Sequence, residues 1–256
     1  MVVVTDREPQ QASAFEESVR TFLGVLGSSP TWTLVTGGEF DTIDGLLGIL
    51  ERAAGDLVCT YRHLHSTQWQ DPRTLGDFVE ILTQATTYPI LVLPHPDAGR
   101  AAGHAVKNTD RVMAITDHLT GDHRLVNYAV RFTQPDGIVY LTHVEDDATF
   151  ERYMGIISKI PAIDTDLARE TIAAQLVKEP RDYIDSSRRI LQDEGIRVRV
   201  EAVVRRGHRL TEYRKLIDQH EVDLLVLNTK DEDQLAMHGM AYPLAVELRQ
   251  IPILML

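Results

Sequence analysis

Three histidines near two strand-like stretches are the side chains whose types and spacing best suit chemistry. His63 and His65 follow an apolar stretch at residues 56–61, and His95 follows another at residues 89–93. In an open parallel sheet, ligands collect beyond the carboxyl ends of strands, where three imidazoles could converge on zinc. A zinc site would also need a fourth ligand and hydrogen-bonded outer partners. We therefore expect three separate histidines and no bound metal.

Motifs of known catalytic machinery are missing from the sequence. It contains no G-x-S-x-G turn, no H-E-x-x-H helix and no G-x-x-x-x-G-K-[ST] phosphate loop. No nucleophile is paired with a base at an informative spacing. We therefore expect that the chain is not an enzyme.

The composition limits the class of protein. The chain has 256 residues, 43% of them hydrophobic, so it can bury sizeable cores and exceeds the usual size of one domain. Its formal charge of -12 argues against binding of duplex nucleic acid, which depends on Lys and Arg at phosphates. The single cysteine, Cys59, excludes a disulfide framework and a thiolate metal cage. The sequence shows no leader and no apolar run of about 18–20 residues, so we expect a cytoplasmic protein that is not integral to a membrane.

Hydrophobic periodicity predicts a doubly wound α/β unit in the second half of the chain. Apolar, β-branched runs alternate with segments whose apolar residues recur at helical spacing. Asp164 is placed to cap a long helix that Pro180 should kink or split, and Gly207 should end a strand. Five strands alternating with four helices predict a parallel sheet. We expect the strands at residues 111–116, 137–144, 196–204, 222–228 and 251–256, and the helices at residues 121–132, 164–191, 210–220 and 241–249.

The first half repeats this pattern in a shorter form. Residues 2–6 read VVVTD, residues 113–117 read MAITD, and both halves end on a short apolar run. Such an echo indicates tandem units, with one strand and one helix missing from the first. We assign a degenerate unit to residues 1–94, a linker rich in Pro, Gly and Ala to residues 95–109, and a complete unit to residues 110–256. In the first unit we expect strands at residues 2–6, 31–36, 56–61 and 89–93, and helices at residues 15–26, 43–53 and 75–85.

One segment of the second half is more apolar than a connection needs to be. It lies between the predicted strand at residues 137–144 and the long helix, and its apolar side chains share one face at helical spacing. We expect a short helix that covers the sheet or the other unit. If this face is exposed, it is the first candidate docking surface for a partner. The residues are Phe150, Tyr153, Met154, Ile157 and Ile160.

The second half resembles a universal stress protein domain from end to end. Its first predicted strand ends in Thr116 and Asp117, and Tyr128 lies in the first helix. The second strand ends in THV at residues 142–144, and VDLLVLNT at residues 222–229 precedes a last strand that contains proline. The first half looks like a degenerate copy, so the whole chain resembles a tandem universal stress protein.

The resemblance implies a position for a nucleotide site. In the nucleotide-binding branch of that family, an Asp after the first strand holds the ribose and backbone after the second strand meets the adenine. A glycine-rich loop after the fourth strand cradles the phosphates, because backbone amides approach an anion closely where Cβ atoms are absent. Asp117 matches the ribose position and Val144 the adenine position. Gly239 matches the third loop glycine, and Met240 replaces the usual Ser or Thr.

The rest of this loop departs from the family pattern. Asn228 and Asp231 stand where the first two glycines are expected, and an acidic run at residues 231–233 lies where phosphate oxygens would lie, with Lys230 as the nearby cation. One like-charge contact at about 4 Å costs roughly 4 kcal/mol at an effective dielectric of about 20. Tight ATP binding is therefore not expected unless a metal ion bridges the carboxylates and the phosphates. The carboxylates could instead favour a neutral or cationic ligand, although a solvated acidic loop is the simpler interpretation. The candidate binding residues are Thr116, Asp117, Val144, Asn228, Lys230, Asp231, Gly239 and Met240.

The first half is further from the family's nucleotide site. Asp6 matches the ribose position, but the loop at residues 62–68 has no glycine. Arg62 and the two histidines of this loop could hold an anion, although surface polarity explains them equally well. In the second half, His143 stands where the family often has His, and we expect it to be structural.

The predicted fold is two universal stress protein-like α/β units, the first of them shortened, packed as an intramolecular pseudo-dimer through their last strands. The resemblance implies a noncatalytic stress-response or regulatory protein that acts through a protein partner, with a weak small-ligand cleft and no firmly bound cofactor. Two alternatives stay open, an ATP or AMP sensor in the second unit and a soluble regulator of a membrane transporter. A homodimer also stays open, because a shortened first unit leaves part of its surface unmatched.

Overall fold

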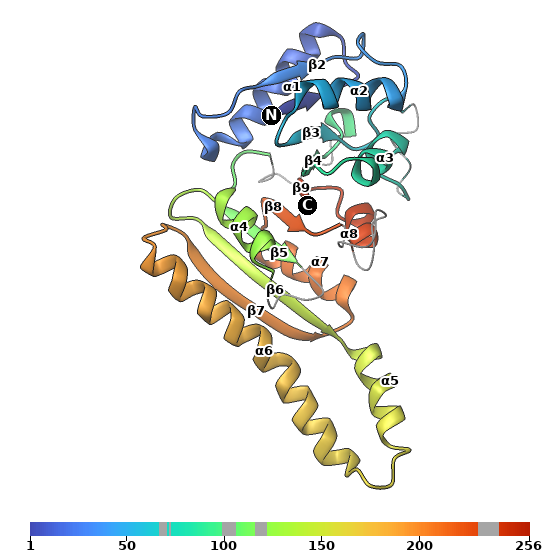
Figure 1. Ribbon diagram of the computed structural model, residues 1–256, viewed down its shortest axis with the longest axis vertical. Helices are drawn as coiled ribbons and strands as arrows, with labels where there is room; N and C mark the ends of the chain where they lie inside the picture. Colours follow the sequence, from blue (N-terminus) through green and yellow to red (C-terminus); the bar gives the residue numbers. More distant parts are fainter. Residues whose placement is uncertain (67–70, 72, 99–105, 116–121, 230–240) are drawn as a thin grey trace.

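A nine-stranded sheet organises the part of the chain that the structure describes (Figure 1). The computed structural model describes residues 1–66, 71, 73–98, 106–115, 122–229 and 241–256. The strands follow the order β2-β1-β3-β4-β9-β8-β5-β6-β7 across the sheet. They are β1 Val2–Val4, β2 Thr33–Val35, β3 Val58–Tyr61, β4 Ile90–Leu93, β5 Arg111–Ile115, β6 Ile138–Asp146, β7 Arg199–Gly207, β8 Leu224–Leu227 and β9 Ile253–Met255.

Helices connect the parallel strands and cover the sheet, which gives the predicted α/β architecture. Most strands are apolar runs because both of their faces are buried, as is typical of parallel sheets. In the described residues the helices are α1 Pro9–Phe22, α2 Ile43–Ala53, α3 Asp77–Ala85, α4 His123–Arg131, α5 Asp147–Ile157, α6 Thr165–Asp193, α7 Arg209–His220 and α8 Ala241–Glu247, with short 3-10 turns η1 Gly24–Leu26 and η2 Pro96–Ala98.

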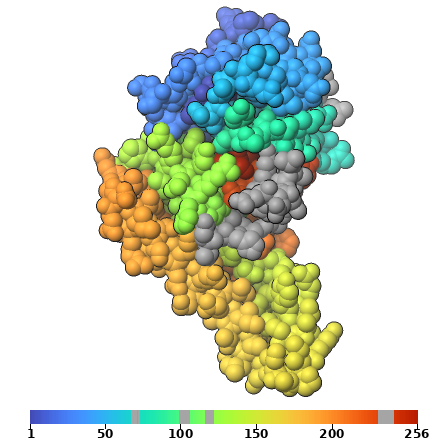
Figure 2. Space-filling model, in the orientation of Figure 1, coloured from blue at the N-terminus to red at the C-terminus, as the bar shows by residue number. Residues whose placement is uncertain are grey.

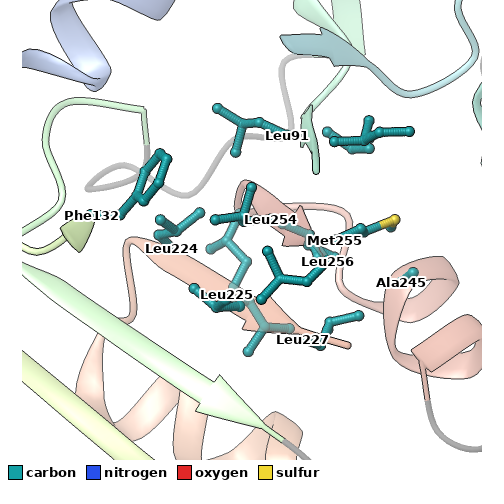
Figure 3. Close-up of a cluster of buried hydrophobic side chains, with 14 of the residues drawn as sticks. Leu91, Phe132, Leu224, Leu225, Leu227, Ala245, Leu254, Met255 and Leu256 are labelled. Atoms are coloured by element: carbon teal, nitrogen blue, oxygen red, sulfur yellow. The ribbon is translucent and has the colours of Figure 1, made fainter. Parts of the chain in front are cut away.

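The two halves of the sheet join through β4 and β9, which is the antiparallel neighbour pair of the sheet. Leu91 pairs with Leu254 at the centre of this seam, and both side chains are fully buried. Strand β9 pairs with β8 on its other edge, and Figure 3 shows Leu254, Met255 and Leu256 near the β8 side chains Leu224, Leu225 and Leu227. The predicted pairing of the two closing strands is confirmed, and each strand covers an edge that the other would otherwise expose.

The predicted helix boundaries need two corrections. Helix α1 begins at Pro9 rather than at residue 15, because proline lacks a backbone N–H and is well suited to the first turn. Helix α6 runs without a break from Thr165 to Asp193, with Pro180 inside it, so the predicted split is wrong. Pro180 and Ile184 are the buried side chains of α6, and their packing keeps the helix continuous across the missing hydrogen bond.

Helix α5 and the first half of α6 form an arm that projects away from the sheet (Figures 1 and 2). At about 1.5 Å per residue, a helix of the length of α6 spans about 44 Å, more than the sheet can cover. The prediction that the apolar segment at residues 150–160 covers the sheet or the other unit is therefore only partly right. Phe150 and Met154 are buried, but Tyr153 is 54% exposed and Ile160 is 42% exposed.

Candidate functional site

The described candidate residues lie at the carboxyl ends of strands in both halves of the sheet. In the first half, Asp6 follows β1, and its carboxylate accepts hydrogen bonds from other residues of the chain. The Tyr61 hydroxyl donates to one carboxylate oxygen, and the backbone N–H of His65 donates to the other at 2.7 Å. Tyr61 also hydrogen-bonds to the Thr5 hydroxyl at 2.9 Å, and burial raises the pKa of Tyr61 to about 12. Both oxygens of the residue that matches the ribose-binding position are thus occupied.

A second loop closes over the same strand end. A Cβ atom at Gly37 would lie 2.7 Å from the carbonyl carbon of Asp6, so the chain after β2 touches the backbone after β1. Only a residue without a side chain permits such an approach. The end of β1 is therefore covered by backbone as well as by side chains.

The three histidine rings have different neighbours, although the charge of His95 acts on His63. The His65 ring packs against Phe40 and Phe78, with ring centroids 5.7 and 5.2 Å away, whereas the His95 ring meets the edge of Tyr61 at 5.3 Å. His63 is buried, and burial, with the nearby Arg62 charge, lowers its pKa. Within the described ranges, no group of three or more His, Cys, Asp or Glu side chains is placed to hold a metal ion.

Arg62 lies in the seam between the halves, not on the surface of a loop. Its guanidinium is buried and donates to the carbonyl oxygens of Ala245 and Leu248, the latter at 2.8 Å. These carbonyls belong to the C-terminal end of α8, which carries partial negative charge. Burial, with Arg249 nearby, lowers the pKa of Arg62 to about 9, so the guanidinium stays charged at neutral pH. The suggested role of Arg62 in holding an external anion is wrong, because its guanidinium is buried and both terminal nitrogens donate to the helix end.

The second half presents Val144 near the end of β6, at the position matched to adenine recognition. Its backbone N–H donates to the Tyr213 hydroxyl at 3.2 Å, and its carbonyl oxygen accepts from Nε of Arg209 at 3.0 Å. Both partners lie on α7, which begins directly after β7. The backbone donor and acceptor that would pair with a purine edge are therefore used within the chain.

Asn228 follows β8 and faces the start of α4. Its side-chain amide donates to one oxygen of Asp122, whose other oxygen caps α4 by accepting from the N–H of Leu125 at 2.9 Å. Burial raises the pKa of Asp122. The Asn228 Oδ1 atom is buried and has no hydrogen-bond partner in the described part of the chain. The sequence offered a signal for Asp122, because it stands immediately before the apolar-periodic residues of the predicted helix.

His143 lies inside β6 and is buried. Its Nε2 atom is 3.3 Å from a carboxylate oxygen of Glu145, on the same side of the strand two residues later. This arrangement fits the structural role expected for this histidine.

Six of the predicted site residues fall outside the residues that the structure describes, so the predictions made for them stay predictions. They are Thr116, Asp117, Lys230, Asp231, Gly239 and Met240. Of the predicted set, the structure thus places Val144 and Asn228, and each of them is tied to neighbouring side chains of the same chain.

Solved structures with the same arrangement of elements include two assigned to universal stress proteins. One, from Pseudomonas aeruginosa UCBPP-PA14, is 11% identical with a TM-score of 0.51, and the match covers 100% of this chain and 81% of that chain. The other, from Archaeoglobus fulgidus DSM 4304, is also 11% identical with a TM-score of 0.51, covering 96% and 76%. A protein of unknown function from Pseudomonas aeruginosa PAO1 is 14% identical with a TM-score of 0.50, covering 100% and 80%. No protein-family model and no curated protein matches the sequence.

The chain has the universal stress protein fold. At 11% identity the likeness extends to the fold alone, and the residues at the strand ends must be judged by their own contacts. The strand order divides at the β4–β9 pair. The second half of the sheet contributes β9-β8-β5-β6-β7, and the first half contributes β2-β1-β3-β4, one strand fewer.

Helix α6 is the longest helix of the described residues, but it does not have the character of a membrane span. None of the described helices combines the length and the apolar composition that crossing a membrane requires.

Proposed function

We propose that this chain is a noncatalytic regulatory protein of the universal stress protein type, which acts through contact with a protein partner and not through nucleotide turnover. The observation that carries the proposal is the use of both Val144 backbone groups by Tyr213 and Arg209. A purine edge could reach this backbone only after both side chains had left it. Each hydrogen bond lost in this way costs about 0.5–1.5 kcal/mol, and more where a charged group is involved.

The first half supports the same proposal by a different contact. Asp6 already accepts from Tyr61 and the His65 amide, and the backbone at Gly37 covers the strand end, so a ribose would have to compete with these contacts. Together with the lack of a catalytic motif in the sequence, this favours a protein that is neither an enzyme nor dependent on a cofactor.

One observation favours the alternative of an ATP or AMP sensor in the second half. The buried Asn228 Oδ1 atom is an acceptor without a partner in the described ranges, and it lies where β8 meets the start of α4. A ligand hydroxyl or amino group could donate to it, which would offset the cost of leaving a buried acceptor unsatisfied. The test must therefore include this half explicitly.

The deciding experiment is calorimetric titration of the full chain with ATP, ADP, AMP and cyclic AMP, with and without magnesium. It is paired with mass spectrometry of small molecules retained after denaturation. We expect no saturable binding in the micromolar range and no retained nucleotide. Saturable binding that Asp117→Ala abolishes, while the exposed Asp218→Ala does not, would overturn the proposal in favour of the sensor.

The partner is sought by crosslinking in stressed cells that produce the tagged chain, followed by quantitative mass spectrometry. A protein recovered in near-stoichiometric amount supports the proposal. Recovery of the chain alone under every stress tried would contradict it. A membrane transporter among the recovered proteins would favour the third alternative.

A further inference from the structure

Exposed apolar side chains concentrate on the arm formed by α5 and the start of α6. Among the described residues, nine large hydrophobic side chains are exposed, and five of them lie on this arm. The other four are spread over α3, α8 and the far end of α6 with the turn after it. The arm residues are Tyr153 at 54% exposure, Ile156 at 54%, Ile160 at 42%, Ile163 at 40% and Leu167 at 62%. We call this set the arm patch.

The arm is built to hold this patch in a fixed position. Phe150 and Met154 face inward from α5 and are buried. The guanidinium of Arg206, on β7, lies over the Phe150 ring at 4.0 Å from its centroid. Arg169 of α6 forms a two-point ion pair with Glu151 of α5, with one of its contacts at 2.9 Å. The two helices are therefore fastened to each other and to the sheet, while the opposite side chains of α5 remain uncovered.

Charges beside the patch are divided between the two helices. Arg152 and Lys159 lie on α5 or at its end, whereas Asp166 and Glu170 lie in the first turns of α6. No ion pair joins any of these four side chains to another residue in the part of the chain that the structure describes. One helix of the arm thus offers unpaired positive charge and the other offers unpaired negative charge, so the surface is complementary to itself.

From these observations we infer that the arm patch is a self-association surface that takes a second copy of this chain. In the complex, α5 of each copy packs against the first turns of α6 of the other about a two-fold axis. The contact is isologous and closes on itself, because each arm supplies both halves of the complementary surface. Two helical hairpins joined in this way form a four-helix bundle.

The area of the patch agrees with this occupant. The exposures correspond to about 500 Å² of apolar surface on one arm, toward the upper end of the roughly 300–600 Å² that the largest patch on a monomer covers. Two such patches remove about 1,000 Å² from water. The flanking charged side chains must therefore also be covered, so that the contact reaches the range of about 1,200–2,000 Å² found for specific interfaces.

The inference concerns the arm alone and does not depend on the proposed function. Its test uses purified protein without nucleotide or cellular partner, whereas the proposed function is tested by titration and crosslinking. Failure of one therefore leaves the other unaffected.

Sedimentation equilibrium over the micromolar range tests the inference with the full chain. We expect a reversible dimer whose dissociation constant rises at least about 100-fold in Ile156→Glu and again in Leu167→Glu, because each change buries two charges at the symmetric contact. The matched control is Ile190→Glu, which changes an equally exposed isoleucine, at 60%, at the far end of α6. Circular dichroism verifies that every variant is folded.

Charge reversal separates the proposed pairing from nonspecific apolar association. Lys159→Glu should weaken the dimer, and adding Asp166→Lys should restore most of the affinity. A wild-type chain that stays monomeric throughout would overturn the inference. So would a dimer that Ile156→Glu leaves unchanged, or one that Ile190→Glu weakens equally.

Discussion

Arg62 links the two halves of the sheet, and its replacement by methionine is expected to lower the free energy of unfolding by about 2–3 kcal/mol. The guanidinium donates two hydrogen bonds, to the carbonyl oxygens of Ala245 and Leu248 at the end of α8. Hydrogen bonds from a charged donor contribute about 1.5–3 kcal/mol each to stability. Without the guanidinium, both carbonyl groups stay buried and unsatisfied, and the folded state loses that contribution. Methionine retains most of the apolar stem, so little packing is lost.

An opposing effect keeps the expected loss from being larger. No carboxylate forms an ion pair with Arg62 among the described residues, and its Nε atom is buried without a hydrogen-bond partner there. Removing this charge therefore also removes a desolvation cost, which offsets part of the lost hydrogen bonding. The carbonyls at the end of the helix decide the balance, because the described residues place no other buried cation near their partial negative charge.

Urea unfolding followed by circular dichroism gives the free energy, and a thermal melt should show a loss of about 5–10 °C for a chain of this size. Arg62→Lys should fall between wild type and Arg62→Met, because one ammonium cannot reproduce the planar fork that meets two carbonyls. The exposed Arg52→Met is the control and should change stability by less than about 0.5 kcal/mol. If the free energy of unfolding of Arg62→Met differs from that of wild type by less than about 0.5 kcal/mol, the two hydrogen bonds contribute no net stability and the reasoning fails.

Three further predictions test the first half and the seam. Gly76→Ala should lower the free energy of unfolding in urea by more than about 2 kcal/mol, because φ is +92° and a Cβ would lie 2.7 Å from the His63 Cα atom. The control is Gly195→Ala, where φ is +68° and nothing lies within 4 Å of the added Cβ, and it should lower the free energy of unfolding by only about 1 kcal/mol. Because burial lowers the pKa of His63 and of His95, the unfolded chain takes up protons first as the pH falls below about 6.5, so stability should decrease there. His63→Asn, which tolerates the left-handed backbone, should flatten that pH profile, and an unchanged slope would refute the assignment. Leu254→Ala should cost about 2–5 kcal/mol in the same urea assay, and a cost below about 1 kcal/mol would show that the seam is loosely packed.

The sheet was largely predictable from the sequence because its signals are local. Largely apolar segments of five to nine residues marked the strands, and the run at the end of each half indicated which two strands would need cover. The pairing of Leu91 with Leu254 follows from that need, since an uncovered apolar edge is unfavourable.

The contacts at the strand ends could not be predicted, because their partners are distant in sequence. Tyr61 lies 55 residues from Asp6, and Tyr213 lies 69 residues from Val144. Arg62 stands in a polar loop and reads as a surface residue, yet its partner Ala245 lies 183 residues away. Whether a polar side chain meets solvent or a buried helix end is decided by tertiary packing, which periodicity does not report.

The two halves prevent access to their strand ends by different means, and this difference determines where a ligand could still bind. In the first half, the obstruction includes backbone, because the chain at Gly37 touches Asp6 and the amide of His65 holds its carboxylate. Removing it would require two loops to move. In the second half, the groups that occupy Val144 are the side chains of Tyr213 and Arg209. Tyr213 is fully buried and fixed by packing, whereas Arg209 is only half-buried and can change rotamer without displacing α7. Any small ligand that this chain does bind is therefore expected in the second half, beside the Asn228 oxygen that has no hydrogen-bond partner among the described residues.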